Sequence, residues 1–193
     1  LLGEAVYAFQ EKKVIDLVSE ITEIENLLSD DSLYLGGVSL MVKGQFLNPH
    51  VDNSHNESFT RYRRLNLLYY VSPKWKLDNG GNFELWDEGL SHPPRTIESR
   101  FNRMVVMATS RHSLHSVSPI VKDVRRCCIS NYYFSTNSID SKTYYHGTYF
   151  RGRPGQPVRD LILRANVVLK RIIRMVNTTG YSDRTHLKRS GKN

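Results

Sequence analysis

Pro49-His50-Val51-Asp52-Asn53 sets an imidazole and a carboxylate two positions apart, and a second candidate imidazole, His115, follows 63 residues after Asp52. Side chains of an extended chain alternate between two faces, so His50 and Asp52 would share one face of a strand. Two imidazoles and one carboxylate on one face of a metal suit non-haem Fe(II) and leave coordination positions open. Taken alone, the motif also fits a capped turn, because its Pro, Asp and Asn residues are turn formers.

Further residues stand in a recognisable order around this motif. Upstream of His115 lie Leu67-Leu68-Tyr69-Tyr70-Val71, then Trp75, then Gly80-Gly81-Asn82-Phe83-Glu84-Leu85; downstream, Arg126 opens Arg126-Cys127-Cys128-Ile129-Ser130-Asn131-Tyr132-Tyr133-Phe134. In this order and spacing, residues 41–134 resemble the Fe(II)/2-oxoglutarate dioxygenases, and most of all their prolyl-hydroxylase-like branch. The resemblance implies a mainly β fold with a double-stranded β-helix core, a jelly-roll variant. It also implies Fe(II), 2-oxoglutarate and O₂, with ascorbate as a further candidate cofactor.

The resemblance implies that His50, Asp52 and His115 are the metal ligands and therefore the catalytic residues. Arg111-His112-Ser113-Leu114-His115 offers two histidines. His115 is preferred because it begins the His-x-x-x-Pro pattern that the family places at the metal, and His112 is expected at the surface or on the substrate side. Asp52 also bears on the reaction, because related halogenases replace this carboxylate with a small residue. Its presence favours hydroxylation.

Three further residues resemble the family's cosubstrate contacts: Arg126, Tyr70 and Ser130. A guanidinium can hold the far carboxylate of 2-oxoglutarate through two charge-assisted hydrogen bonds. Neighbours on a strand face opposite ways, so only one of Arg125 and Arg126 points inward; Arg126 is preferred because it lies six residues before an aromatic, Tyr132. The family often has another tyrosine in a position that Met41 or Lys43 occupies here, which is a departure from its pattern.

Substrate contacts are expected near Arg63 and Asn53. Arg63 stands seven residues before Tyr70, where prolyl hydroxylases of this branch can place a basic residue facing substrate. It also belongs to Arg61-Tyr62-Arg63-Arg64, which would fit a solvated strand edge almost as well. The segment 53–60 is the second expected contributor to substrate choice.

The resemblance implies hydroxylation of an unactivated C–H bond in a prolyl or peptide substrate or a small metabolite, with CO₂ and succinate as co-products. One alternative is a nucleic-acid demethylase of the same chemistry, motivated by the net charge of +8. This alternative is not favoured, because no obvious base-stacking aromatic accompanies a basic cluster other than residues 61–64. The second alternative is a non-catalytic binding module on the same scaffold, since a fold does not fix function.

Composition indicates one globular domain. The chain has 193 residues, of which 39% are hydrophobic and 24% charged, and that length can bury a sizeable core. No apolar run approaches the ~18 residues that span a bilayer. The two cysteines are adjacent and are interpreted as reduced strand residues, so a cytoplasmic location is the default expectation. The start has neither Met nor a basic segment followed by an apolar one, which suggests a trimmed chain or a fragment.

The expected organisation is a single domain over residues 1–176 with a β-helix core at about 38–150, followed by a loose basic tail over 177–193. Helical spacing predicts one or two helices within residues 4–29. Short apolar runs predict strands over residues 38–47, 65–71, 82–86, 104–108, 127–134 and 144–150.

The C-terminal segment is expected to form one long amphipathic helix from Val158 to about Val176. Its apolar face is expected to pack on the outside of the core as a structural brace; that face comprises Leu161, Ile162, Ala165, Leu169 and Ile172. Charge is uneven along the chain, since residues 1–34 have a net charge of −6 and residues 151–193 of +9. The basic end is interpreted as a solvated helix face with a frayed terminus, although it could attract nucleic acid or an acidic surface.

Overall fold

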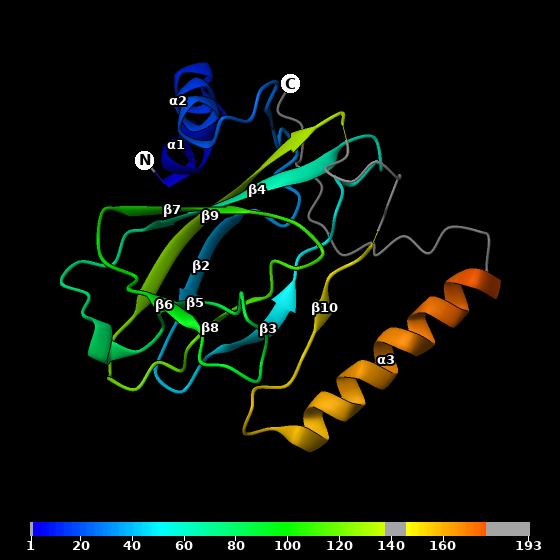
Figure 1. Ribbon diagram of the computed structural model, residues 1–193. Coiled ribbons are helices and arrows are strands. Elements are labelled where there is room, and N and C mark those ends of the chain that lie inside the picture. Colours follow the sequence, from blue (N-terminus) through cyan, green and yellow to red (C-terminus); the bar gives the residue numbers. More distant parts are fainter. Residues whose placement is uncertain (1, 138–145, 177–193) are drawn as a thin grey trace.

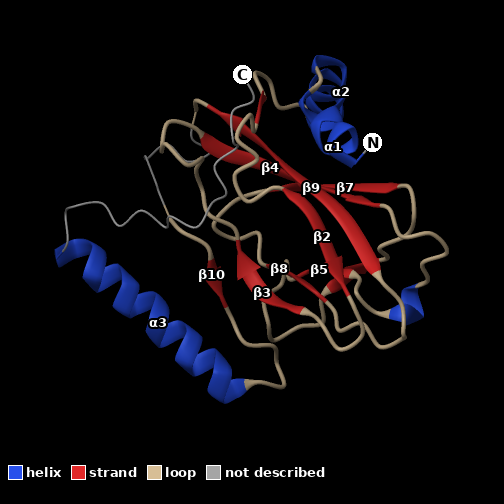
Figure 2. Ribbon diagram, turned by 180° about the vertical axis from the view of Figure 1, so that it is seen from behind, coloured by secondary structure: helices blue, strands red, loops and turns tan. Residues whose placement is uncertain are grey.

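The computed structural model describes residues 2–137 and 146–176, and its centre is a pair of antiparallel sheets facing each other (Figures 1 and 2). The first sheet has the order β1-β9-β4-β7, with β2 also paired to β9; its strands are β1 (Leu28–Ser29), β2 (Gly37–Met41), β4 (Tyr62–Tyr70), β7 (Arg103–Ala108) and β9 (Arg126–Ser135). The second sheet has the order β10-β3-β8-β5-β6; its strands are β3 (Leu47–Val51), β5 (Phe83–Leu85), β6 (Arg95–Ile97), β8 (His115–Val117) and β10 (Tyr149–Phe150). The expected mainly β jelly-roll core is confirmed.

Strand β9 separates two environments, because its side chains alternate between the two faces of the first sheet. Outward, Ile129 and Tyr133 pack with Leu65 and Leu67 of β4 against the N-terminal helices, which cover this face (Figure 1). These helices are α1 (Leu2–Tyr7), the 3₁₀ turn η1 (Ala8–Gln10) and α2 (Lys12–Thr22); they overlap the range 4–29 where helices are predicted, and α1 begins two residues before it. The inward face of β9 is therefore left to line the space between the sheets.

Hydrogen bonds from side chains of β9 to backbone carbonyls of the N-terminal segment attach the helices to this outer face. Asn131 Nδ2 donates to the carbonyl of Val6 at 3.1 Å, and the Tyr133 hydroxyl donates to the carbonyl of Phe9. Val18 of α2 is fully buried in the same cluster. The polar contacts satisfy groups at the ends of short helices that would otherwise lack partners. The N-terminal segment thus closes the outer side of the sheet and fixes the position of β9.

The strand predicted over residues 38–47 is wrong as one element. β2 ends at Met41, and the chain turns at Gly44, whose φ of +85° lies in the region that glycine adopts without strain. Val42 N donates to Gln45 Oε1 at 2.9 Å, and Gly44 N donates to the carbonyl of Ile120 at 2.8 Å. β3 then begins in the opposite sheet at Leu47. The break sends the chain across the sandwich and delivers His50 to its inner side.

The predicted C-terminal helix exists as α3 (Pro157–Val176), but its predicted packing is wrong. Leu161, Ile162 and Leu169 are 68%, 63% and 56% exposed, and Ala165 is also exposed. The Ile172 side chain lies outside the described side chains. α3 lies beside β10 at the edge of the molecule (Figures 1 and 2). It therefore does not brace the jelly roll with its apolar face.

Polar groups in the first turn of α3 attach it to the core. Arg151 donates through Nε and a terminal nitrogen to the two carboxylate oxygens of Asp160, at 2.7 and 3.0 Å. The backbone N–H of Gly152 donates to Asp160 Oδ1 at 2.8 Å. This pairing turns the Asp160 side of the helix toward β10. The predicted loose tail over residues 177–193, and residues 144–145 of the last predicted strand, lie outside the described residues.

In the part of the chain that the structure describes, every helix is too short or too polar to cross a bilayer. The two cysteines, Cys127 and Cys128, are free thiols on β9.

A buried and an exposed leucine give different expectations for the free energy of unfolding. Leu67→Ala removes a fully buried side chain from the cluster beneath the N-terminal helices, and should lower the free energy of unfolding by about 2–5 kcal/mol. Leu161→Ala changes a side chain that is 68% exposed, and should alter it by less than ~0.5 kcal/mol. Denaturant titration measures both; equal losses would mean that α3 is buried against the core in solution.

Candidate active site

His50, Asp52 and His115 converge between the two sheets. β3 pairs with β8 so that His50 stands opposite His115, and Asp52 follows directly after β3. His50 Nε2 lies 3.7 Å from Asp52 Oδ1, and His115 Nε2 lies 3.7 Å from Asp52 Oδ2. One donor atom from each of the three residues lies within 4.8 Å of the others, and all three side chains are buried. The donors are thus arranged to hold one metal ion.

Backbone carbonyls orient both imidazoles. His50 Nδ1 bonds to the carbonyl of Asn48 at 2.9 Å, and His115 Nδ1 bonds to the carbonyl of Ser113 at the same distance. A carbonyl only accepts, so Nδ1 carries the proton and Nε2 presents its lone pair to the site. Burial, with the neighbouring His115, lowers the pKa of His50 to about 4 although Asp52 opposes the shift. A neutral imidazole is the form that binds metal.

Asp52 is held as a carboxylate by its neighbours. Burial alone would raise its pKa, but His115, Arg63 and His50 together hold the pKa below its usual range. Asn66 Nδ2 of β4 also donates to Asp52 Oδ2 at 3.0 Å. Sequence interpretation missed Asn66, although an amide within the apolar run Leu65–Leu68 is the kind of signal that marks a buried polar contact.

A β-bulge brings Arg63 to the same place. The pairing of β4 with β9 shifts register between Arg63 and Leu65, which adds one residue to β4 and changes the direction of the side chains before it. The Arg63 guanidinium lies over the Tyr132 ring at 3.6 Å and 3.6 Å from Asp52 Oδ2. Its side chain is fully buried, and its three nitrogens have no hydrogen-bond partner among the described residues. The expected solvated edge is therefore wrong for Arg63.

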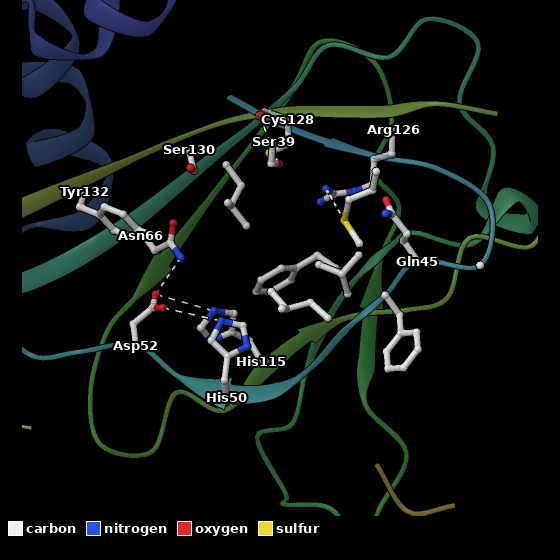
Figure 3. A pocket seen from close by; sticks show the side chains of 17 residues that line it. Ser39, Gln45, His50, Asp52, Asn66, His115, Arg126, Cys128, Ser130 and Tyr132 are labelled. Carbon is white, nitrogen blue, oxygen red and sulfur yellow. Dashed lines mark hydrogen bonds and ion pairs between the residues drawn. The ribbon is translucent and has the colours of Figure 1, made fainter. Parts of the chain in front are cut away.

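A cavity of about 530 Å³ opens beside the triad. Strands of both sheets contribute to its wall, which comprises Ser39, Met41, Gly44, Gln45, Phe46, Leu47, His50, Asp52, Asn66, Leu68, Phe83, His115, Val117, Arg126, Cys128, Ser130 and Tyr132. Figure 3 shows the triad at one end of this cavity and Arg126 at the other. The space between them is largely apolar, with Leu68 and Phe83 among its lining. A molecule held at both ends would contact this apolar wall between them.

Arg126 presents a buried positive charge at its end of the cavity. Its Nε donates to Ser99 Oγ at a long 3.3 Å, and a terminal nitrogen lies 3.6 Å from Met41 Sδ, a weak acceptor. None of the described carboxylates forms an ion pair with it. Arg125 is exposed, so the strand alternation sends the two arginines in opposite directions. A buried guanidinium with such weak partners fits a carboxylate ligand.

Tyr70 and Ser130 lie near Arg126 in different ways. Ser130 lines the cavity, and its hydroxyl donates to the carbonyl of Gly37 at 3.3 Å. Tyr70 is fully buried in the core, with Arg126 Cζ 5.1 Å from the centre of its ring. The Tyr70 hydroxyl forms no hydrogen bond of good geometry with any described residue, and burial raises its pKa to about 12. It is a neutral donor that lacks a partner.

Asn53 and His112 do not line the cavity, and neither do Arg63 and Tyr70. Asn53 is buried, but its amide donates to the carbonyl of His55 at 2.8 Å and so shapes the loop after Asp52. His112 is exposed, away from the donors of the triad. Met41 rather than Lys43 lines the cavity at the position where the family pattern differs. Gln45, which sequence interpretation did not single out, lines the Arg126 end (Figure 3).

Comparison with known proteins agrees with this geometry. The family model of the 2OG-Fe(II) oxygenase superfamily matches residues 36–134, just over half of the chain. No curated protein matches the chain in sequence. Among solved structures, an oxidoreductase of the 2OG-Fe(II) oxygenase family from Burkholderia pseudomallei is similar with a TM-score of 0.52 at 12% identity; the match covers 69% of this chain and 55% of that one.

Two prolyl hydroxylases are also similar in fold. A truncated form of the viral collagen prolyl hydroxylase of Paramecium Bursaria Chlorella virus-1 matches with a TM-score of 0.51 at 16% identity, over 68% of this chain and 70% of that one. A prolyl hydroxylase from Trichoplax adhaerens, in complex with a hypoxia-inducible factor peptide fragment, matches with a TM-score of 0.44 at 20% identity. That match covers 67% of this chain and 61% of the Trichoplax chain.

Metal binding distinguishes the two histidines of residues 112–115. His115→Ala removes one of three donors that meet between the sheets, so Fe(II) binding under anaerobic conditions should be lost in titration calorimetry. His112→Ala changes an exposed side chain and should bind Fe(II) as the unaltered chain does. Loss of binding in His112→Ala with retention in His115→Ala would contradict the assignment.

Proposed function

Because the chain belongs to the 2OG-Fe(II) oxygenase superfamily, we propose that it is a dioxygenase that hydroxylates an unactivated C–H bond with Fe(II), 2-oxoglutarate and O₂. The observation that carries the proposal is the buried set of His50, Asp52 and His115, whose donors lie within 4.8 Å of one another. Two neutral imidazoles and one carboxylate fit Fe(II) and leave coordination positions for other ligands. When bound, the iron and 2-oxoglutarate supply the oxidising power, and CO₂ and succinate are the co-products.

The residues of this chain would prepare the site before any reaction. Each imidazole is fixed by one carbonyl, and Asp52 is fixed by Asn66 and kept ionised by the positive Arg63 beside it. Such supporting contacts keep ligands from rotating and preserve their protonation states. With Asp52 present, all three protein ligand positions are filled, which favours transfer of a hydroxyl group over transfer of a halide. Because the Arg63 guanidinium lies 3.6 Å from Asp52 Oδ2, we propose that the main role of Arg63 is to pair with Asp52.

We propose that Arg126 binds the far carboxylate of 2-oxoglutarate, and that Tyr70 and Ser130 assist it. Arg126 stands at the end of the cavity away from the triad and has no described carboxylate as partner (Figure 3). The Tyr70 hydroxyl is neutral, buried and without a good partner beside it. A guanidinium and a neutral hydroxyl that donate to a carboxylate compensate it for its lost hydration. The apolar wall at Leu68 and Phe83 suits the methylene carbons of the same molecule.

For the second substrate we propose a prolyl or peptide group or a small metabolite. The cavity of about 530 Å³ is within the usual size of a small-molecule site, and part of it would hold 2-oxoglutarate. Arg126 is the only Lys or Arg among the described residues that line the cavity, so the net positive charge of the chain is not gathered around it. This distribution favours a small or peptidic substrate over nucleic acid. Arg63 and Asn53 stay predictions as substrate contacts.

Coupled turnover tests the proposal. Purified chain with Fe(II), 2-oxoglutarate and O₂, with and without ascorbate as an auxiliary reductant, should consume O₂ and release succinate. Addition of the right peptide, free amino acid or metabolite should raise that rate and give a product heavier by one oxygen atom. Binding of Fe(II) and 2-oxoglutarate without succinate release under any condition would favour a binding module. Turnover coupled only to methylated DNA or RNA, with salt-sensitive affinity, would favour a demethylase.

The two neighbouring arginines give a matched pair of variants. Arg126→Ala should raise the KM for 2-oxoglutarate by about two to four orders of magnitude, because a buried carboxylate without its partner costs about 3–5 kcal/mol. Arg125→Ala alters an exposed side chain directly before β9 and should leave that KM unchanged. Kinetics at varied 2-oxoglutarate measures both. Equal effects, or the reverse order, would show that Arg126 is not the carboxylate's partner.

A further inference from the structure

The apolar face of α3 points away from the protein. Successive residues of an α-helix are ~100° apart, so most of the exposed apolar side chains of α3 fall on one continuous arc, while Val167, which is 37% exposed, lies on the opposite side. The members of the arc are Val158, Leu161, Ile162, Ala165, Val168 and Leu169. The opposite side of the helix holds Asp160 and Leu163, which are half-buried toward the core. The Arg151–Asp160 pair keeps this orientation. The wide apolar surface therefore has no cover among the described residues.

Basic side chains border this apolar arc on both of its edges. By the same ~100° spacing, Arg164 follows one edge of the arc, and Arg159 and Lys170 follow the other. All three are exposed. Asp160 is the one acidic residue within α3, and it is already paired with Arg151. An apolar face with basic flanks and no free acid is the pattern of a helix that lies in the plane of a membrane interface.

We propose that α3 docks on an anionic membrane surface, with its apolar arc in the lipid and its basic flanks at the headgroups. Long basic side chains can keep their charge at the headgroups while their methylene stems cover apolar surface. The side chains of the arc are exposed, and α3 lies at the edge of the molecule (Figures 1 and 2), so the helix can meet a surface without the jelly roll blocking it. The proposal is independent of the oxygenase reaction.

Charge favours lipid over a second copy of this helix. Two α3 helices packed through their apolar arcs would bring Arg159, Arg164 and Lys170 of one chain toward the same residues of the other. Like charges along a helix interface oppose association. Anionic headgroups instead neutralise these flanks. The charge pattern thus selects a negatively charged surface as the occupant.

Vesicle flotation with the full 193-residue chain tests the proposal. The chain should float with vesicles of phosphatidylcholine and phosphatidylglycerol at low salt, and should bind phosphatidylcholine alone far more weakly. Replacing Arg159, Arg164 and Lys170 together with Gln should lower the partition coefficient by roughly a hundredfold, about fivefold per charge. High salt should reduce binding of the unaltered chain in the same direction.

Matched apolar variants separate lipid insertion from general stickiness. Leu161→Gln with Leu169→Gln should abolish flotation, because both exposed side chains belong to the arc. Leu77→Gln with Phe101→Gln changes side chains that are 56% and 52% exposed elsewhere on the surface, and should leave flotation intact. Thermal unfolding of both variants should match the unaltered chain, which shows that a loss of flotation does not come from misfolding.

Three outcomes would overturn the proposal. Equal binding to both kinds of vesicle would remove the role of the basic flanks. A concentration-dependent dimer in light scattering, lost in the Leu161→Gln and Leu169→Gln variant while vesicles do not bind, would assign the arc to a second copy. A marked fall in unfolding temperature of that variant would mean that α3 covers the core of its own chain.

Discussion

The antiparallel pairing of β3 with β8 is the constraint on which the site depends. It sets His50 opposite His115, and the two rings lie 4.1 Å apart between their centres. β8 has only three residues, and β5 pairs with its other side, so the position of β8 depends on both neighbours. The hydrogen bonds of the sheet thus hold the two histidines in contact, although they lie far apart in the sequence. The donor set is rigid before a metal arrives, as a precise site requires.

Such a site concentrates polar groups that the interior does not favour. Asp52, Arg63 and Arg126 are buried, and neither guanidinium is fully hydrogen-bonded. Burying charge without full compensation is costly, so the surrounding structure must hold it in place. The cluster formed by the N-terminal helices and the outer faces of β4 and β9 contributes that stability on the other side of the same sheet. Because its side chains alternate, β9 contributes one face to the hydrophobic cluster under the N-terminal helices and the other face to the wall of the cavity.

The sequence predicted the fold and the triad better than the surroundings of the triad. Period-two spacing was enough to set His50 and Asp52 on one side, because Asp52 follows directly after the strand that holds His50. For the two arginines it said only that one of them points inward, and the spacing to Tyr132 favoured Arg126. Period-two spacing was not enough for Arg63, because the bulge in β4 depends on how two distant strands pair. Asn66 was missed for a similar reason, since its partner Asp52 lies on the other sheet. β8 was missed because three residues give no periodic pattern.

The sequence pattern predicted the C-terminal helix but not its packing. Periodicity predicted α3 correctly, because amphipathic spacing depends on the helix alone. The same periodicity says only that one face avoids water, and does not say which surface covers it. In α3 the described contacts with the core at the first turn are polar, because Asp160 pairs with Arg151 and the backbone of Gly152, and Leu161 and Ile162 lie outside. Burial of an apolar face against the core is therefore a separate inference from helix formation. Once an apolar face is left exposed, the charges that flank it bear on which surface it can meet.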